Sequence, residues 1–346
     1  MNYILSLVPF LCVSLHAVIQ INEDFDWTKV YKQVFTQQEM HQNRNKPELL
    51  YTQTHLAPFT QLIFSWNAQR PEKGHFSFYV QVQDAHTGKW YDYHHLLDWG
   101  NEIQQSYFNR SGGSTFHHAR LELEGNRKAS AFRVKVLSSD NNHDLRLVKA
   151  LIVSASDFTQ FKPEPSLDQG KGLSSFFINA VPAVSQFLVN HPQAPVLCSP
   201  TSISMVVGAL KGRILDPLLF ADHVYDSGLK AFGNWAFNTA YAYELCNEKI
   251  LFYPTRLASF NHLHALLQQR IPIVVSVRGP LAGSAKPYEH GHLLVVIGYD
   301  AQKKEVICHD PAFETDEKVL VFYGLHDFIQ AWERSKRMTY KPQLIY

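Results

Sequence analysis

Apolar and polar residues alternate along much of the chain between about residues 20 and 154. Residues 76–83 and 132–136 show the period of two most clearly, which is typical of strands with one buried face and one exposed face. His-Thr-Gly-Lys at residues 86–89 separates two such runs and predicts a hairpin turn. We therefore expect this half of the chain to form a β-sandwich or jelly roll.

The pattern changes beyond residue 176, where helical and strand periods mix. Apolar residues 203, 206, 207 and 210 share one helical face, and Gly212 is placed to end that helix. Further helices are predicted at 263–267 and 325–332, and strands at 273–277, 293–299 and 306–308. This half is predicted to be an α+β domain.

A chain of 346 residues is long enough for two domains with separate cores. Residues 156–175 are rich in Pro and Gly and read as a linker. The predicted organisation is a signal peptide at 1–19, a β-sandwich accessory domain at 20–155, this linker, and the α+β domain at 176–346.

The N-terminus has the pattern of a signal peptide. Residues 4–15 are almost wholly apolar, too few to span a bilayer, and Ala17 offers a small residue for cleavage, although no Lys or Arg precedes residue 29. We therefore expect export to the cell envelope or beyond, without a transmembrane anchor. With 32 Lys and Arg against 31 Asp and Glu, the chain lacks the charge excess of a nucleic-acid-binding protein.

Cys198 is the candidate nucleophile. It lies just before the predicted helix at 203–210, with Pro200 suited to the first helical turn. A thiol at a helix N-terminus experiences the positive end of the helix dipole, which favours the thiolate. A buried, inert cysteine is the alternative interpretation.

His292 and Asp310 are the candidate base and orienting carboxylate. A hairpin centred between Ala301 and Gln302 places His292 opposite Asp310 or Pro311, on the same face of the sheet. A register slip of one residue would bring His309 there instead. With Cys198, these residues make a nucleophile, base and orienter, as in Cys-His-Asp hydrolases.

The motifs that contain these residues resemble those of exported peptidase C39-like proteins, which are papain-like cysteine peptidases. The matching segments are Val-Pro-Ala-Val-Ser-Gln at 181–186, Cys-Ser-Pro-Thr-Ser at 198–202, the helix-like run at 233–242, Gly-His at 291–292 and Asp-Pro-Ala at 310–312. Tryptophan motifs at 65–68, 90–91 and 99–100 resemble the N-terminal β domain of one exported branch.

The resemblance implies a papain-like fold for the second domain and roles for individual residues. Gln186 would donate to the oxyanion beside the Cys198 backbone N–H, with Gln193 as the competing candidate. Asn234 and Trp235 would line the substrate groove. Many relatives have Cys-Gly where this chain has Cys198-Ser199. No cofactor or metal is implied.

Other residues have simpler interpretations. The adjacent histidine pairs 94–95 and 117–118 point to opposite faces of a strand and do not suggest a metal site. Trp66, Trp90 and Trp99 suit a sandwich core better than a glycan-binding platform. Cys246 and Cys308 are expected to be buried, and a disulfide between them is left open.

The sequence thus predicts an exported cysteine peptidase that cleaves peptide bonds in a peptide, a protein or the cell wall. One alternative is an amidase or transpeptidase acting on cell-wall peptides with the same three residues. Another is a binding or adhesion protein with a vestigial triad, whose β domain holds a glycan.

Overall fold

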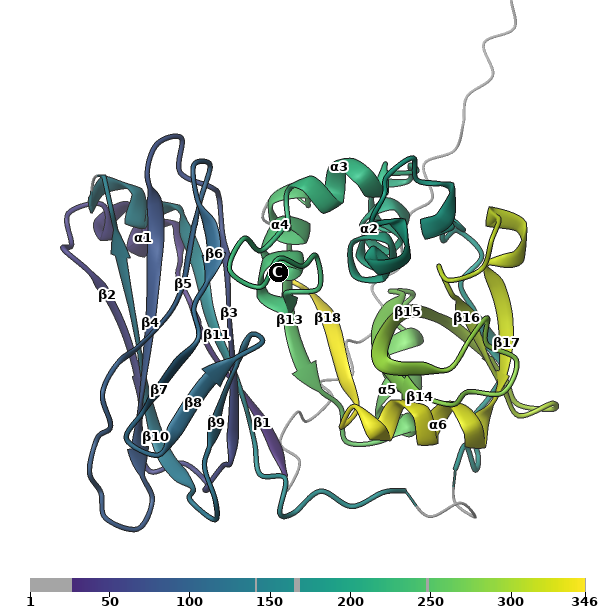
Figure 1. The fold of residues 1–346 in the computed structure, drawn as a ribbon, viewed down its shortest axis with the longest axis horizontal. Helices are drawn as coiled ribbons and strands as arrows, with labels where there is room; N and C mark the ends of the chain where they lie inside the picture. The colour runs from purple at the N-terminus through teal and green to yellow at the C-terminus, as the bar shows by residue number, and fades with distance from the viewer. Residues whose placement is uncertain (1–26, 141, 165–168, 247–248, 346) are drawn as a thin grey trace, which may run out of the picture.

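The computed structural model describes residues 27–140, 142–164, 169–246 and 249–345 (Figure 1). The predicted signal peptide at residues 1–19 lies outside the described residues. Two domains lie side by side, an all-β domain and an α+β domain, which confirms the predicted fold class (Figure 1). No helix within the described ranges is both long and apolar enough to cross a membrane.

The first domain is a sandwich of two antiparallel sheets. One sheet has the strand order β1-β11-β3-β9-β8-β7 and the other the order β2-β10-β4-β5-β6. Their strands are β1 (Thr28–Val34), β2 (Leu49–Gln53), β3 (Gln61–Ala68), β4 (His75–Asp84), β5 (His94–Gly100), β6 (Gln104–Ser106), β7 (Asn109–Ser111), β8 (Ser114–His117), β9 (Arg120–Leu123), β10 (Ala129–Ser138) and β11 (Val148–Ser156). A short helix, α1 (Gln37–Asn43), follows β1, and a 3₁₀ turn (Asn142–Leu147) precedes β11.

The sandwich core comes from the alternation seen in the sequence. On β4, Phe76, Phe78, Val80 and Val82 are fully buried, while the residues between them are only partly buried. Trp66 and Trp99 are also fully buried, with ring centroids 5.3 Å apart. The core interpretation of these two tryptophans is therefore confirmed, and neither presents a ring to a glycan. Trp90 is half-buried beneath the guanidinium of Arg133, which lies 4.0 Å from its ring centroid.

The second domain is built around one antiparallel sheet with the order β13-β18-β14-β15-β16-β17. Its strands are β13 (Ile250–Arg256), β14 (Ile273–Gly279), β15 (Tyr288–Asp300), β16 (Glu305–His309), β17 (Leu320–Gly324) and β18 (Met338–Leu344), with the short β12 (Phe176–Phe177) paired to β15. The helices are α2 (Cys198–Lys211), α3 (Pro217–Asp222), α4 (Trp235–Leu245), α5 (Phe260–Leu267) and α6 (Leu325–Arg334). Three 3₁₀ turns, η2 (Gln186–Leu188), η3 (Ala194–Val196) and η4 (Asp316–Lys318), complete it.

Helix α2 is the element that positions the nucleophile. It begins at Cys198 and ends where Gly212 takes the left-handed conformation (φ 65°), as the sequence predicts. It packs on β15 and beside α4. Lys211 at its C-terminal end donates to the carbonyl of Leu245, the last residue of α4, so the C-terminal ends of the two helices lie together. Near their N-terminal ends, Leu197 before α2 and Phe232 before α4 belong to one small buried apolar cluster.

The two domains are joined by hydrogen bonds as well as apolar contacts. The whole of β3 is buried because the sandwich interior covers one face while β13 and α4 cover the other (Figure 1). The amide of Asn67 on β3 accepts from the N–H of Phe252 (2.8 Å) and donates to its carbonyl (2.9 Å). Through these two bonds the Asn67 side chain pairs with the backbone of Phe252 and ties the β domain to the second domain.

Candidate active site

The structure brings the three predicted catalytic residues together. Cys198 is the first residue of α2 and is half-buried, His292 lies on β15, and Asp310 follows β16. His292 Nε2 lies 2.7 Å from Asp310 Oδ1, and the thiol of Cys198 interacts with the imidazole. Because Nε2 is held by the carboxylate, Nδ1 is the nitrogen left for the thiol. The arrangement is a nucleophile, a base and an orienting acid in series.

The predicted hairpin register is wrong by about two residues, although it assigns the correct face. Val296 pairs with Cys308 and Val295 with His309, so continuation of the ladder would place Asp310 opposite Leu294 rather than His292. His292 and Leu294 lie on the same face of β15, and Asp310 therefore reaches His292 diagonally. His309 points to the other face, where its Nδ1 lies 3.0 Å from the carbonyl of Pro182.

A β-bulge at Ile297 sets this register. Asp300 pairs with Glu305 near the turn, and the pairing shifts by one residue between Val296 and Gly298. Without the extra residue, Asp310 would lie opposite Val295 and point away from His292. β12 pairs with β15 at this point, with Phe177 opposite Gly298. A Cβ on Gly298 would lie 2.4 Å from the carbonyl oxygen of Phe176, so only glycine fits beside the bulge.

Burial and charge shift the pKa values of all three groups. Burial raises the pKa of the Cys198 thiol, but the hydrogen bond and positive charge of His292 outweigh burial and lower it overall. Burial lowers the pKa of His292, but Asp310 and Cys198 outweigh burial and raise it overall. The pKa of Asp310 is lowered because His292 and two tyrosine hydroxyls offset its burial. These directions favour a thiolate beside an imidazolium.

Two tyrosines complete the surroundings of Asp310 and were not part of the sequence prediction. The hydroxyl of Tyr288 lies 2.7 Å, and that of Tyr323 2.6 Å, from Asp310 Oδ2. The N–H of Ala312 donates to Oδ1 at 2.9 Å. The sequence marks Tyr288 only by its place four residues before His292, and Tyr323 lies on β17, for which no strand was predicted.

The two candidate oxyanion donors lie in different environments. Gln186 is buried in η2, where its Nε2 donates to the carbonyl of Ala194 at 3.0 Å. Its Oε1 finds no donor among the described residues. The amide nitrogen has a second hydrogen, which this contact leaves available. Gln193, by contrast, is exposed at the start of η3.

The structure places Asn234 in the contact between the two domains. Its Oδ1 accepts from the N–H groups of Ala236 and Phe237, capping α4, and its Nδ2 donates to Asp226 at 2.7 Å. Trp235 is half-buried, with the guanidinium of Arg120 from the β domain 5.7 Å from its ring centroid. A role for either residue in substrate binding stays a prediction.

Cys246 and Cys308 are both buried free thiols, so the disulfide left open by the sequence is not formed. Burial raises the pKa of Cys246 to about 11 and that of Cys308 well above its ordinary value. Both thiols are therefore poor nucleophiles. Across the part of the chain that the structure describes, no three His, Cys, Asp or Glu side chains are grouped to hold a metal ion.

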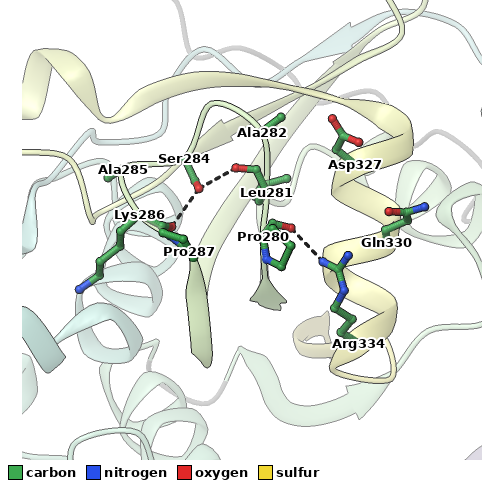
Figure 2. Close-up of a pocket in the computed structure, with 10 residues that line it drawn as sticks. All are labelled: Pro280, Leu281, Ala282, Ser284, Ala285, Lys286, Pro287, Asp327, Gln330 and Arg334. Carbon is green, nitrogen blue, oxygen red and sulfur yellow. Dashed lines mark hydrogen bonds between the residues drawn. The ribbon is translucent and has the colours of Figure 1, made fainter.

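A surface pocket of about 510 Å³ lies between the β14–β15 loop and α6 (Figure 2). Residues 280–282 and 284–287 form one wall, and Asp327, Gln330 and Arg334 of α6 form the other. Cys198, His292 and Asp310 do not line it. Figure 2 shows Arg334 pointing towards the loop, where it donates to the carbonyl of Pro280 at 2.8 Å. The loop that leads to Tyr288 is thus one wall of the pocket.

A helix-borne cysteine beside a His–Asp pair on an antiparallel sheet is the arrangement of a papain-like cysteine peptidase. Residues 178–340 match the model of the Peptidase_C39 like family, and this segment of the chain belongs to that family. The match confirms the resemblance seen in the sequence and identifies a C39-like cysteine peptidase domain.

Other comparisons add little. The crystal structure of xylellain, a cysteine protease from Xylella fastidiosa, aligns with 15% sequence identity and a TM-score of 0.30, covering 54% of this chain and 91% of that one. A search of curated proteins returned no match.

Proposed function

We propose that the chain is an exported cysteine peptidase that hydrolyses peptide bonds with Cys198 as nucleophile, His292 as base and Asp310 as orienting carboxylate. The observation that supports the proposal best is the 2.7 Å contact between His292 Nε2 and Asp310 Oδ1, beside a thiol at the start of α2. Export is supported by the apolar N-terminal residues 4–15 alone.

The proposed reaction is acyl transfer through a covalent intermediate. The Cys198 thiolate attacks the scissile carbonyl carbon and forms a C–S bond, while the carbonyl oxygen becomes an oxyanion. Collapse of this intermediate breaks the C–N bond, and His292 gives its Nδ1 proton to the leaving amine. Water then attacks the thioester with His292 as base, releasing the acid and restoring the thiol. Asp310 stays ionised and holds the imidazole throughout.

The oxyanion is proposed to bind two N–H donors. As the first residue of α2, Cys198 has a backbone N–H without an acceptor inside its own helix. The second donor is the free hydrogen of Gln186 Nε2, whose other hydrogen is directed to Ala194. The substrate is a peptide or protein outside the cytoplasm, with cell-wall peptide included.

The first test is the reactivity of Cys198 towards limiting iodoacetamide at pH 6, mapped by mass spectrometry. Because the pKa of Cys198 is lowered, part of this thiol stays ionised at a pH where an ordinary thiol is fully protonated. Labelling should stop only at a still lower pH, where the Cys198 thiolate itself is protonated. We expect selective labelling of Cys198 over Cys246 and Cys308. In His292→Ala, burial remains without the imidazolium, so labelling should fall by about tenfold for each unit that the pKa rises. Equally slow labelling of all three cysteines would favour the alternative of a binding protein with a vestigial triad.

The second test concerns the oxyanion donor. Gln186→Ala is expected to lower kcat by about 10²-fold with KM little changed, because the donor acts on charge that develops only in the transition state. The matched control is Gln193→Ala, which removes an exposed glutamine from the same region and should leave kcat unchanged. Steady-state kinetics on a cleaved library peptide measures both. The reverse result would assign the donor to Gln193.

A further inference from the structure

Two buried hydroxyl groups converge on one oxygen of Asp310. Tyr288 opens β15 and Tyr323 lies on β17, and both donate to Oδ2, at 2.7 and 2.6 Å. The other oxygen, Oδ1, is occupied by His292 Nε2 and the N–H of Ala312. Asp310 has no exposed surface, so these groups take the place of water around the carboxylate.

We propose that Tyr288 and Tyr323 are positioning residues that fix the plane of the Asp310 carboxylate and thereby hold His292 facing Cys198. A carboxylate bonded through one oxygen alone can rotate about its Cβ–Cγ bond. Donors at Oδ2 remove that freedom, so Oδ1 stays directed at Nε2 and Nδ1 stays directed at the thiol. The proposal rests on the proposed peptidase function and names residues that the sequence motifs did not include.

Tyr288 has a second contact with the same unit. Its ring stacks on the imidazole of His292, with centroids 4.1 Å apart and planes inclined by 18°. The ring therefore limits tilting of the base, while the hydroxyl limits rotation of the acid. The contact of Tyr323 with Asp310 is made by its hydroxyl and limits rotation of the acid.

The loop before Tyr288 is itself anchored (Figure 2). Arg334 on α6 donates to the carbonyls of Arg278 and Pro280, at 3.2 and 2.8 Å. Within the loop, Ser284 Oγ donates to the carbonyl of Leu281 at 2.7 Å, and Figure 2 shows it between that carbonyl and the one of Lys286. The anchor fixes the main chain that delivers Tyr288 to the site.

The experiment measures the rate of Cys198 alkylation by iodoacetamide against pH, which needs no substrate. Tyr288→Phe and Tyr323→Phe remove one hydroxyl each and keep the rings. Without one donor the carboxylate is free to rotate, so Nδ1 is less well directed at the thiol and labelling slows even at pH 6, where Asp310 is ionised. Loss of a donor also raises the pKa of Asp310, so the imidazolium loses its counter-charge at a higher pH and the acidic limb of the profile moves up. We expect about 3- to 10-fold slower labelling at pH 6 for each variant. For the double variant we expect a larger loss, with the acidic limb about one pH unit higher, since one unit of pKa corresponds to a tenfold change.

Tyr107→Phe is the matched control. In the β domain, the hydroxyl of Tyr107 lies 2.6 Å from Asp98 Oδ2, and Asp98 Oδ1 lies 2.8 Å from His95 Nε2. Removing this hydroxyl breaks the same kind of bond without touching the site, and alkylation of Cys198 should stay within twofold of the parent protein. Thermal melting of every variant confirms that it is folded.

A double-mutant cycle shows whether the tyrosines act through Asp310. In an Asp310→Asn background, the Tyr→Phe pair should slow alkylation by less than twofold beyond Asp310→Asn alone. A further tenfold loss there would overturn the proposal, as would a folded double variant whose rate and acidic limb match the parent. If Cys198 of the parent protein is not selectively labelled, it is the proposed function that fails.

Discussion

Cys198→Ala is expected to have no measurable hydrolysis of any library peptide, a loss in kcat of at least about 10⁴-fold. The substitution removes the atom that forms the acyl-enzyme, and in hydrolases of this type loss of the nucleophile costs about as much as loss of the whole triad. The fold should be unchanged, because Cys198 opens α2 without a partner that the helix depends on. Circular dichroism and peptide hydrolysis together test the prediction.

The matched control for Cys198→Ala is Cys246→Ala, a buried thiol at the C-terminal end of α4. It should retain full activity, because its raised pKa keeps it protonated. His292→Ala should abolish hydrolysis as Cys198→Ala does, while Asp310→Asn should reduce it less completely, since an amide can still contact Nε2. Normal turnover by folded Cys198→Ala would end the proposed mechanism.

The sequence predicted those features that depend on local pattern. The alternation on β4 gives the buried face directly, and Gly212 marks the end of α2 because few other residues take the left-handed conformation there. Cys198, His292 and Asp310 could be chosen because each has chemistry and a place at the end of a predicted element. His292 and Asp310 needed only to lie on the same face of the sheet to meet, and that face was predicted correctly although the pairing register was not.

The register could not be predicted from the hairpin alone. The bulge at Ile297 is held by β12, which lies about 120 residues earlier in the chain and whose neighbour Ile178 donates to the Ile297 carbonyl at 2.9 Å. A glycine inside a strand is the local sign of such a bulge, and Gly298 supplies it. Since the prediction treated residues 293–299 as a regular strand, it misplaced the pairing.

Two further contacts at or near the site could not be predicted, because they join residues that are far apart in the chain or on elements with little local pattern. Tyr323 reaches Asp310 only because β17 pairs with β16, and a short edge strand of this kind has little local pattern. The hydrogen bond from the Asn234 amide to Asp226, which is held in turn by the β domain, was not predicted either. Neither contact follows from spacing along the chain.

Asp226→Ala is expected to lower the free energy of unfolding by about 3 kcal/mol or more, because buried donors left without an acceptor cost about 1–3 kcal/mol each. Asp226 is fully buried and accepts from the N–H and hydroxyl of Ser106 in the β domain, at 2.9 and 2.5 Å. It also accepts from the amide of Asn234 and the N–H of Gly228. A Cβ on Gly228 would lie 1.9 Å from the carbonyl oxygen of Ser106, so the two backbones meet closely here.

Asp222→Ala is the matched control for Asp226→Ala, since Asp222 is exposed four residues earlier and its loss should change stability by less than about 0.5 kcal/mol. Denaturant unfolding measures both variants, and equal midpoints would contradict the prediction. The effect should reach the nucleophile, because Leu197, the residue before Cys198, shares a small buried cluster with Ala221 and with Phe232, which lies between Asp226 and α4. Asp226→Ala should therefore also slow Cys198 alkylation under conditions where the protein is still folded, whereas Asp222→Ala should not. Slower alkylation in Asp226→Ala but not in Asp222→Ala would mean that the contact with the β domain supports the catalytic cysteine as well as the stability of the protein.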